Sequence, residues 1–196
     1  MSEAEPSAAG IVLKARRTVF ENSRFHVYAD WVAGEGGLEV KDYLVVAPRF
    51  AAGDLVTGVT VLPIWNDHIV LLKTFRHAIR RETLEAPRGF IDHDETPRQA
   101  AVRELAEETG LAADPANLVD LGNCAPEGST IAARIALFAA PDCRMVASPA
   151  ADEIGLGRYQ AISLRDAETL LQEMRLEDPT TALCLHRYFL WVEKNR

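Results

Sequence analysis

The most constraining feature of the sequence is residues 86–112, APRGFIDHDETPRQAAVRELAEETGLA, which encode one helix with both of its ends marked. Thr96 is followed three residues later by Gln99, which is the spacing of a capping box, and Pro97 suits the first helical position. Gly110 suits the left-handed conformation with which many helices end. The sequence therefore predicts a helix that begins at Pro97 and ends just before Gly110.

This helix carries three glutamates on one face. On a wheel of about 100° per residue, Glu107 lies roughly 60° to one side of Glu104 and Glu108 roughly 40° to the other. Glu104 and Glu108 should repel each other by ~0.2–0.5 kcal/mol on an isolated helix. A solvated acidic face is the ordinary explanation of such a cluster. The alternative is a divalent cation between the carboxylates, which would turn the repulsion into attraction.

The same wheel leads us to expect the core on the side of the helix opposite the glutamates. The residues expected there are Val102, Leu105, Ala106 and Thr109. In this arrangement the glutamates face outward. Ala100 and Ala101 precede them by one turn and are small enough to let another backbone or a ligand approach.

The spacing around the glutamates favours the cation. From its first glycine, the segment reads G-x5-E-x7-R-E-L-x-E-E-x-G-L. The matching residues are Gly89, Glu95, Arg103, Glu104, Leu105, Glu107, Glu108, Gly110 and Leu111. Every position of the Nudix box is filled, and the sequence resembles the Nudix hydrolase superfamily. The resemblance implies an α/β (α+β) fold in which a mixed β-sheet is sandwiched between helices.

The resemblance also implies a metal site. Glu104 and Glu108 would be the main ligands of Mg²⁺, or of Mn²⁺ in its place, and Glu107 would assist. The backbone carbonyl of Arg88 would contribute as well. Carboxylate and carbonyl oxygens are the hard ligands that these ions prefer.

Three further positions of the box have structural roles. Gly89 permits a close backbone approach that a Cβ atom would block. Arg103 can neutralise Glu95 or Glu107 and so hold the loop against the helix. The resemblance also implies a catalytic set, which consists of Glu104, Glu107 and Glu108 with Arg103 beside them.

Members of the family generally cleave a nucleoside diphosphate linked to another moiety, X. A diphosphate is polyanionic, so an acidic site holds it through bridging cations, which also lower the pKa of a bound water. Attack of water at phosphorus yields a nucleoside monophosphate and X-phosphate. No nucleophilic side chain is required.

The regions flanking the box resemble the ADP-ribose and nucleotide-sugar pyrophosphatase branch. Pro126, fifteen residues after Leu111, matches the downstream proline of that branch. The run Ala125-Pro126-Glu127-Gly128 replaces the usual Ser-Pro-Gly, and Arg88 adds a cation at the metal loop. These departures leave ADP-ribose, ADP-linked sugars, other nucleotide sugars and dinucleotides such as NADH or Ap(n)A open as substrates.

Loops near the box supply the candidates for substrate binding. Arg76 would receive the distal phosphate or ribose and Arg88 could touch a phosphate, although solvated cations are the ordinary alternative. Glu85 could order the loop, approach the metal or form a salt bridge. A general base must reach the attacking water. The candidates are Glu153, which we favour, and Asp152 and Glu127.

The chain divides into a disordered tail at residues 1–10, a β region at 11–50 and the Nudix hydrolase domain at 51–196. The β region at 11–50 is expected to be antiparallel and, by the resemblance, to pair two subunits into a homodimer. Strands are expected at residues 17–21, 25–32, 38–46, 118–124, 133–139 and 157–161, with a hairpin at 59–75. Two further helices are expected from Ser163 to about residue 175 and from Asp178 to about residue 194.

Composition excludes several other classes of function. The net charge of −8 provides no broad basic field for nucleic acid. The sequence shows no signal peptide and no apolar run of the ~20 residues that a bilayer span needs, so we expect a cytoplasmic protein. The three widely spaced cysteines are read as reduced packing residues. The remaining alternative is a non-catalytic Nudix module that binds or senses a nucleotide sugar.

Overall fold

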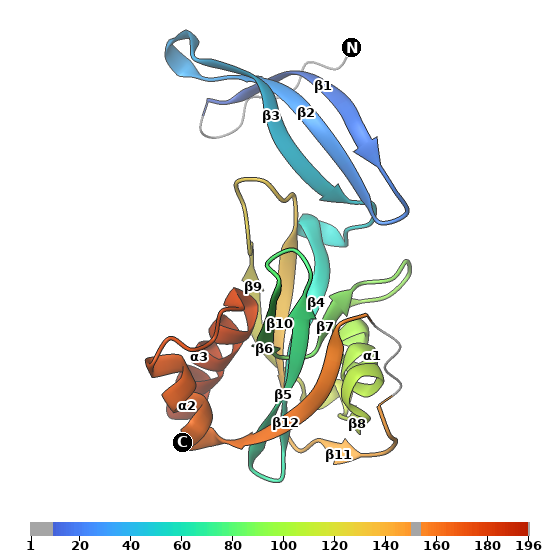
Figure 1. Ribbon diagram of the computed structural model, residues 1–196, viewed down its shortest axis with the longest axis vertical. Coiled ribbons are helices and arrows are strands. Elements are labelled where there is room, and N and C mark those ends of the chain that lie inside the picture. Colours follow the sequence, from blue (N-terminus) through green and yellow to red (C-terminus); the bar gives the residue numbers. More distant parts are fainter. Residues whose placement is uncertain (1–9, 150–153, 196) are drawn as a thin grey trace.

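The computed structural model describes residues 10–149 and 154–195 (Figure 1). The strands are β1 Val12–Glu21, β2 Phe25–Ala33, β3 Glu39–Pro48, β4 Val56–Trp65, β5 His68–Arg76, β6 Arg81–Glu85, β7 Arg88–Phe90, β8 Leu111–Ala112, β9 Val119–Cys124, β10 Arg134–Ala140, β11 Arg144–Met145 and β12 Leu156–Ser163. The helices are α1 Pro97–Thr109, α2 Leu164–Gln172 and α3 Pro179–Lys194, with short 3₁₀ turns at Glu35–Gly37, Gly53–Leu55 and Pro115–Asn117.

Seven strands form the central sheet. Their order is β12-β5-β4-β10-β9, with β6 paired to β5 and β7 paired to β4. The β4 and β10 strands are parallel and the other pairs are antiparallel. The α1 helix covers one face of this sheet, and α2 and α3 cover the other (Figure 1). The expected mixed sheet between helices is confirmed.

The β4 strand runs through the centre of the molecule and is buried along almost all of its length. Because alternate side chains of a strand point to opposite faces, β4 contributes to two cores. Val59 and Val61 pack in the cluster beneath α1, whereas Leu62 and Ile64 pack in the cluster beneath α2 and α3. This strand therefore fixes both helical layers relative to the sheet.

The ends of α1 are those that the sequence predicts. The Thr96 hydroxyl accepts from the Gln99 backbone N–H at 3.3 Å, and the Gln99 side chain accepts from the Thr96 N–H at 2.9 Å. Gly110 closes the helix with φ = 71°, in the left-handed region that glycine adopts at little cost. Local hydrogen bonding alone thus determines where this helix starts and stops.

The expected orientation of α1 is wrong for the glutamates, although Leu105 and Thr109 are buried as expected. Ala100 and Ala101, expected to let another backbone or a ligand approach, are fully buried with Leu105, and Glu104 and Glu108 are buried as well. Of the three glutamates, Glu107 alone is exposed. The two alanines let α1 lie close to β4 and β7, which it contacts, so the glutamates of the following turns point toward the loop instead of into solvent.

The N-terminal strands β1, β2 and β3 form a separate antiparallel sheet at one end of the molecule (Figure 1). Its outer strand β3 is held by the connection between β9 and β10. The Val46 N–H donates to the carbonyl of Thr130 at 2.8 Å, and the Ala132 N–H donates to the carbonyl of Val46 at 2.9 Å. The start of β2 also contacts the body of the protein, where the rings of Phe25 and Phe90 meet edge to face at 5.8 Å.

Two short strands, β6 and β7, were not expected from the sequence. The β6 and β7 strands are short, and β7 contains only three residues, one of them a glycine. Their pairing with β5 and β4 is a tertiary effect that no local pattern indicates. The first strand also begins earlier than expected, at Val12.

Candidate active site

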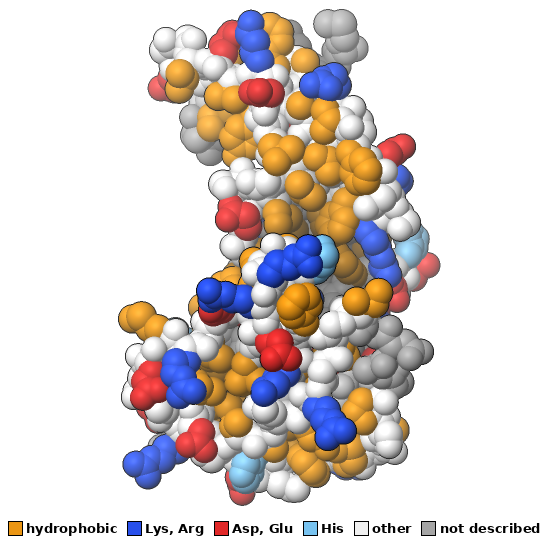
Figure 2. All heavy atoms as spheres, in the orientation of Figure 1, with side chains coloured by type: hydrophobic (Ala, Val, Ile, Leu, Met, Phe, Trp, Pro, Cys, Tyr) orange, Lys and Arg blue, Asp and Glu red, His pale blue; other side chains and the backbone are white. Residues whose placement is uncertain are grey.

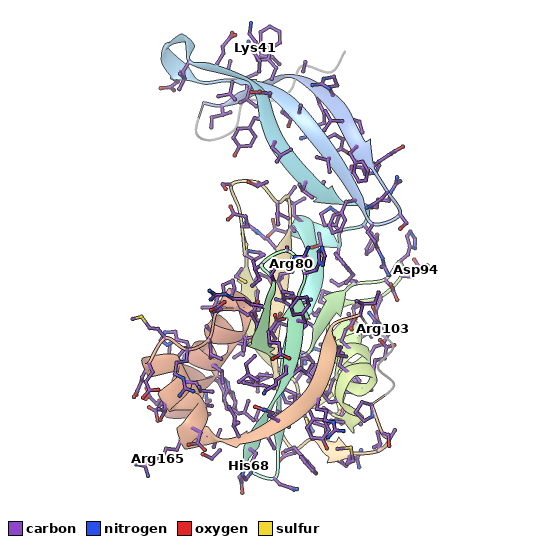
Figure 3. The ribbon with its side chains drawn as sticks, viewed as in Figure 1. Lys41, His68, Arg80, Asp94, Arg103 and Arg165 are labelled. Atoms are coloured by element: carbon purple, nitrogen blue, oxygen red, sulfur yellow. The ribbon has the colours of Figure 1, made fainter. Side chains whose placement is uncertain are left out.

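A pocket of about 740 Å³ opens beside α1 and β7. It is lined by Arg24, Gly58, Val59, Thr60, Arg76, Arg88, Gly89, Phe90, Asp92, Arg103, Glu104, Glu107, Pro126, Ile135, Asp178 and Thr180. The walls come mainly from β4, β7, α1 and the start of α3. Single residues of β5, β10, the β9–β10 connection and the N-terminal region complete them. Figure 3 shows Arg103 on α1, on the opposite side of the sheet from α2 and α3.

Two glycines allow the helix, the loop and the sheet to meet at this pocket. A Cβ atom on Gly89 would overlap the carboxylate of Glu104. A Cβ atom on Gly58 would lie 2.7 Å from the carbonyl oxygen of Gly89, which is closer than real Cβ atoms approach. The Glu104 carboxylate consequently lies directly against the β7 backbone.

Arg103 joins the acidic residues of the box. Its guanidinium donates to both carboxylate oxygens of Glu95, at 3.0 and 2.9 Å, and to the carbonyl of Phe90 at 2.9 Å. Its Nη1 atom also donates to Glu104 at 2.7 Å and to Glu107 at 3.2 Å. The expected role of Arg103, holding the loop against the helix, agrees with these contacts.

These contacts alter the pKa values of both partners. The hydrogen bond from Arg103 lowers the pKa of Glu95 below its usual value, and this effect outweighs the opposing effect of burial. The hydrogen bond to Glu95, opposed by burial and supported by Glu104, raises the pKa of Arg103. Both groups are therefore charged at neutral pH.

Glu108 lies deeper than the other two glutamates. Its carboxylate accepts the backbone N–H of Arg88 at 3.0 Å, so it fixes the start of β7 from the helix side. Glu104 and Glu108 thus contact consecutive residues of the same short strand. A single loop and a single helix face bring them together, as the spacing of the box suggests.

The donor chemistry of this site fits a hard divalent cation. Glu104, Glu107 and Glu108 supply carboxylate oxygens, and the Arg103 guanidinium already places a positive charge between Glu104 and Glu107. Within residues 10–149 and 154–195, no group of three or more acidic, histidine or cysteine side chains is arranged to hold a metal. Because the Nη1 atom of Arg103 already contacts Glu104 and Glu107, an ion at Glu104 would have to replace this contact. The contacts of Arg103 with Glu95 and Phe90 involve other atoms and can persist.

A row of alternating charges runs from Arg76 of β5 through β6 and β7 to Asp178 at the start of α3. Arg76 donates to Glu85 through Nε at 2.9 Å and through Nη2 at 2.5 Å. Arg88 contacts Glu85 through Nη2 at 2.8 Å and Asp178 through Nη1 at 2.5 Å. Glu85 also accepts the hydroxyl of Thr83. Of the roles considered for Glu85, the salt bridge is the one the structure contains.

The remaining sequence candidates fall in different places. Pro126 lines the pocket, whereas Glu127 is an exposed residue outside its lining that accepts hydrogen bonds from Ser129. Glu153, our expected general base, and Asp152 lie outside the described residues. The general base is therefore still a prediction.

Several pocket residues escaped the sequence reasoning. Arg24 reaches the pocket from the turn before β2, with its guanidinium over the ring of Phe90 at 5.6 Å. Asp178 and Thr180 line it from the start of α3, where Asp178 is the N-cap. The Asp-Pro pair signalled a helix start, but nothing in the sequence indicated that this helix start borders the site.

The fold and the glutamate-bearing helix define an α/β protein that presents carboxylates beside a glycine-containing strand. Residues 54–139 match the family model of the NUDIX domain. The resemblance to the Nudix superfamily is therefore confirmed over these residues.

The chain is also similar to named hydrolases. It is 35% identical over 91 residues to an ADP-sugar pyrophosphatase of Mus musculus, covering 40% of this chain and 42% of that protein. It is 30% identical over 99 residues to an ADP-ribose pyrophosphatase of Bacillus subtilis (strain 168), covering 50% of each. The chain thus spans half or less of the length of these two relatives.

A crystal structure of an ADP compounds hydrolase has the same fold. It matches with a TM-score of 0.78 at 21% identity, covering 94% of this chain and 95% of that one. At this coverage the match includes most of the N-terminal sheet as well as the central sheet. In the part of the chain that is described, none of the helices has both the length and the apolar character of a membrane span.

Proposed function

We propose that this protein hydrolyses the diphosphate of ADP-ribose or a related ADP-sugar, giving AMP and X-phosphate. The observation that carries the proposal is the placement of Glu104 against Gly89 and of Glu108 against the Arg88 backbone, at the edge of a pocket large enough for a nucleotide. The similarity to an ADP-sugar and an ADP-ribose pyrophosphatase supports this substrate class.

The charge of the pocket supports a requirement for metal. Its lining contains four arginines and four carboxylates, so the charged side chains balance. Each arginine also has a carboxylate or an aromatic ring beside it. A diphosphate would bring uncompensated negative charge into this balanced site. We therefore propose Mg²⁺, or Mn²⁺ in its place, as the cofactor.

Glu104, Glu107 and Glu108 would hold the ion, with the carbonyl of Arg88. When bound, the ion supplies charge neutralisation and a water of lowered pKa. Arg103 keeps the loop at Glu95 in place, and Arg76 and Arg88 bind the phosphate portion of the substrate. Glu153 is our candidate for the base that takes the proton of the attacking water.

We also propose that the protein is a cytoplasmic homodimer paired through β1, β2 and β3. Figure 2 shows hydrophobic side chains gathered over this sheet. Val19, Phe20 and Leu44 are among its exposed apolar residues, at 44%, 57% and 49% exposure. Covering such a surface would be favourable because it removes apolar area from water.

A substrate panel tests the activity. Release of the nucleotide and phosphomonoester products, coupled to a phosphatase, is measured for ADP-ribose, ADP-glucose, GDP-mannose, NADH and Ap4A, with Mg²⁺, Mn²⁺ or EDTA. We expect the ADP compounds to be the best substrates and EDTA to abolish turnover. If no compound is hydrolysed but one raises the melting temperature, the protein is a nucleotide-sugar binding module.

A further inference from the structure

Arg88 of β7 lies at the junction of three other elements. Its backbone N–H donates to Glu108 of α1, while its side chain contacts Glu85 of β6 and Asp178 at the start of α3. The guanidinium lines the pocket, with 28% of the side chain exposed. Its position in the pocket is thus determined by two carboxylates on different elements.

The two carboxylates that hold Arg88 are buried. Glu85 is 2% exposed and Asp178 is 7% exposed. Asp178 is further fixed by the backbone N–H of Thr181 and by the hydroxyls of Thr180 and Thr181, at 2.7–2.8 Å. Asp178 is therefore held rigidly against Arg88.

Arg76 and Arg88 converge on the same oxygen. The Nη2 atoms of both arginines lie within 2.8 Å of Oε2 of Glu85. Two guanidinium groups held this close together can both reach one phosphoryl group, and arginine binds phosphate through directed, charge-assisted hydrogen bonds. The Glu85 carboxylate holds the two positively charged guanidinium groups together, and without it they would repel each other.

We propose that Arg76 and Arg88 form a clamp for a single phosphoryl group and that Asp178 is a positioning residue for this clamp, acting through Arg88. The inference rests on the proposed function, because it assigns part of the substrate's diphosphate to this wall of the pocket. In this role Asp178 acts through its contact with Arg88 and not through a contact with substrate. It couples the start of α3 to the phosphate site.

The test uses Asp178→Asn, because asparagine caps helices as well as aspartate does and so preserves α3. Exposed Glu177, paired with Arg81 at 2.9 Å, provides the control Glu177→Gln. ADP and AMP are titrated calorimetrically into the protein with Mg²⁺ present. We expect wild type to prefer ADP, and Asp178→Asn to weaken ADP binding about tenfold while AMP binding and the control change little.

A double-mutant cycle decides whether Asp178 acts through Arg88. In an Arg88→Met background, Asp178→Asn should have no further effect on ADP binding. An equal effect in both backgrounds would overturn the inference, as would tighter ADP binding by Asp178→Asn, which would mean that the carboxylate merely repels phosphate. Loss of thermal stability with unchanged ADP affinity would assign Asp178 a structural role only.

Kinetics separate this inference from the proposed function. For the best hydrolysed substrate, Asp178→Asn should raise KM about tenfold with kcat within threefold of wild type. If the wild-type protein hydrolyses no ADP compound but the ADP-binding cycle behaves as expected, the proposed activity fails and the clamp stands. If hydrolysis is normal and the variants bind ADP like wild type, the clamp fails and the activity stands.

Discussion

Glu108 is only 7% exposed, so it does not belong to a solvated acidic face. Its carboxylate accepts the Arg88 N–H at 3.0 Å, and glutamine can preserve that acceptor while removing the charge. We expect Glu108→Gln to lower kcat at least ~10²-fold, because the anchoring of the cation depends on the charge. Steady-state kinetics with excess Mg²⁺ measures the loss.

The fold should survive this change, and circular dichroism and thermal melting provide the control. A Glu108→Gln protein that unfolds would show that the carboxylate is needed for the structure instead. A folded protein with full activity would remove Glu108 from the catalytic set.

Gly89 is a second residue at which the structure does not tolerate a larger side chain. A methyl group there would overlap the Glu104 carboxylate, so Gly89→Ala must displace either the helix glutamate or the β7 strand. A shift of about 1 Å in a catalytic group can cost on the order of 10²-fold in rate, and we expect a loss of that size. The measurement is kcat for the best substrate of the panel.

Gly128→Ala is the matched control, because a Cβ atom there would meet only the Ala125 side chain at an ordinary 3.6 Å. This control should keep its activity. Equal activity of Gly89→Ala and wild type would show that the Glu104 position is unimportant.

At the scale of single elements, α1 was the most predictable. Its capping box and terminal glycine act through local hydrogen bonds, which a sequence displays directly. Its buried face was predicted wrongly because Glu104 and Glu108 were assumed to avoid the core. The contacts with β7 that allow their burial come from a strand whose pairing is tertiary.

The difference between local and tertiary contacts also explains which residues of the candidate site could be predicted from the sequence. The glutamates, Gly89 and Arg103 lie within one local segment, so their proximity could be inferred from spacing. Arg24 and Asp178 come from distant elements, and only the assembled fold brings them to the pocket. Their sequence neighbourhoods show a turn and a helix start, which occur throughout proteins.

The N-cap of α1 gives a test of stability without chemistry. Thr96→Ala removes the acceptor of the Gln99 N–H, and we expect it to lower the free energy of unfolding by ~1 kcal/mol. Thr96→Ser should restore most of this loss, because it keeps the hydroxyl. Urea denaturation followed by circular dichroism measures both, and kcat should stay near the wild-type value. A large loss of kcat would mean that the start of α1 contributes to the site.

The N-cap of α3 should make stability depend on pH. The folded-state pKa of Asp178 is below its ordinary value of 3.8, so its contribution to stability is present above pH 3.8 and is lost as the pH falls through the folded pKa. We expect Asp178→Asn to show a weaker loss of stability over this range than wild type. Parallel acid dependence in urea denaturation of the two proteins would contradict this assignment.

At the scale of the whole molecule, the N-terminal sheet is the part least explained by a single subunit. The register places Phe20 opposite Val27 and Leu44 opposite Ala29, so these four residues share one face of the sheet. Phe20 and Leu44 are 57% and 49% exposed, which leaves this apolar face largely uncovered within the subunit. A second copy of the chain would bury it, as the proposed homodimer requires.

The dimer predicts a specific response to charge on that face. Light scattering should give twice the chain mass of 21.6 kDa for the wild-type protein, and the double variant Phe20→Glu, Leu44→Glu should give the single-chain mass. Buried unpaired carboxylates would cost more than the association provides. Leu190→Glu, at an exposed position on α3, is the control and should stay dimeric. A wild-type protein of single-chain mass at micromolar concentration would exclude this assembly, and the apolar face would then need another explanation.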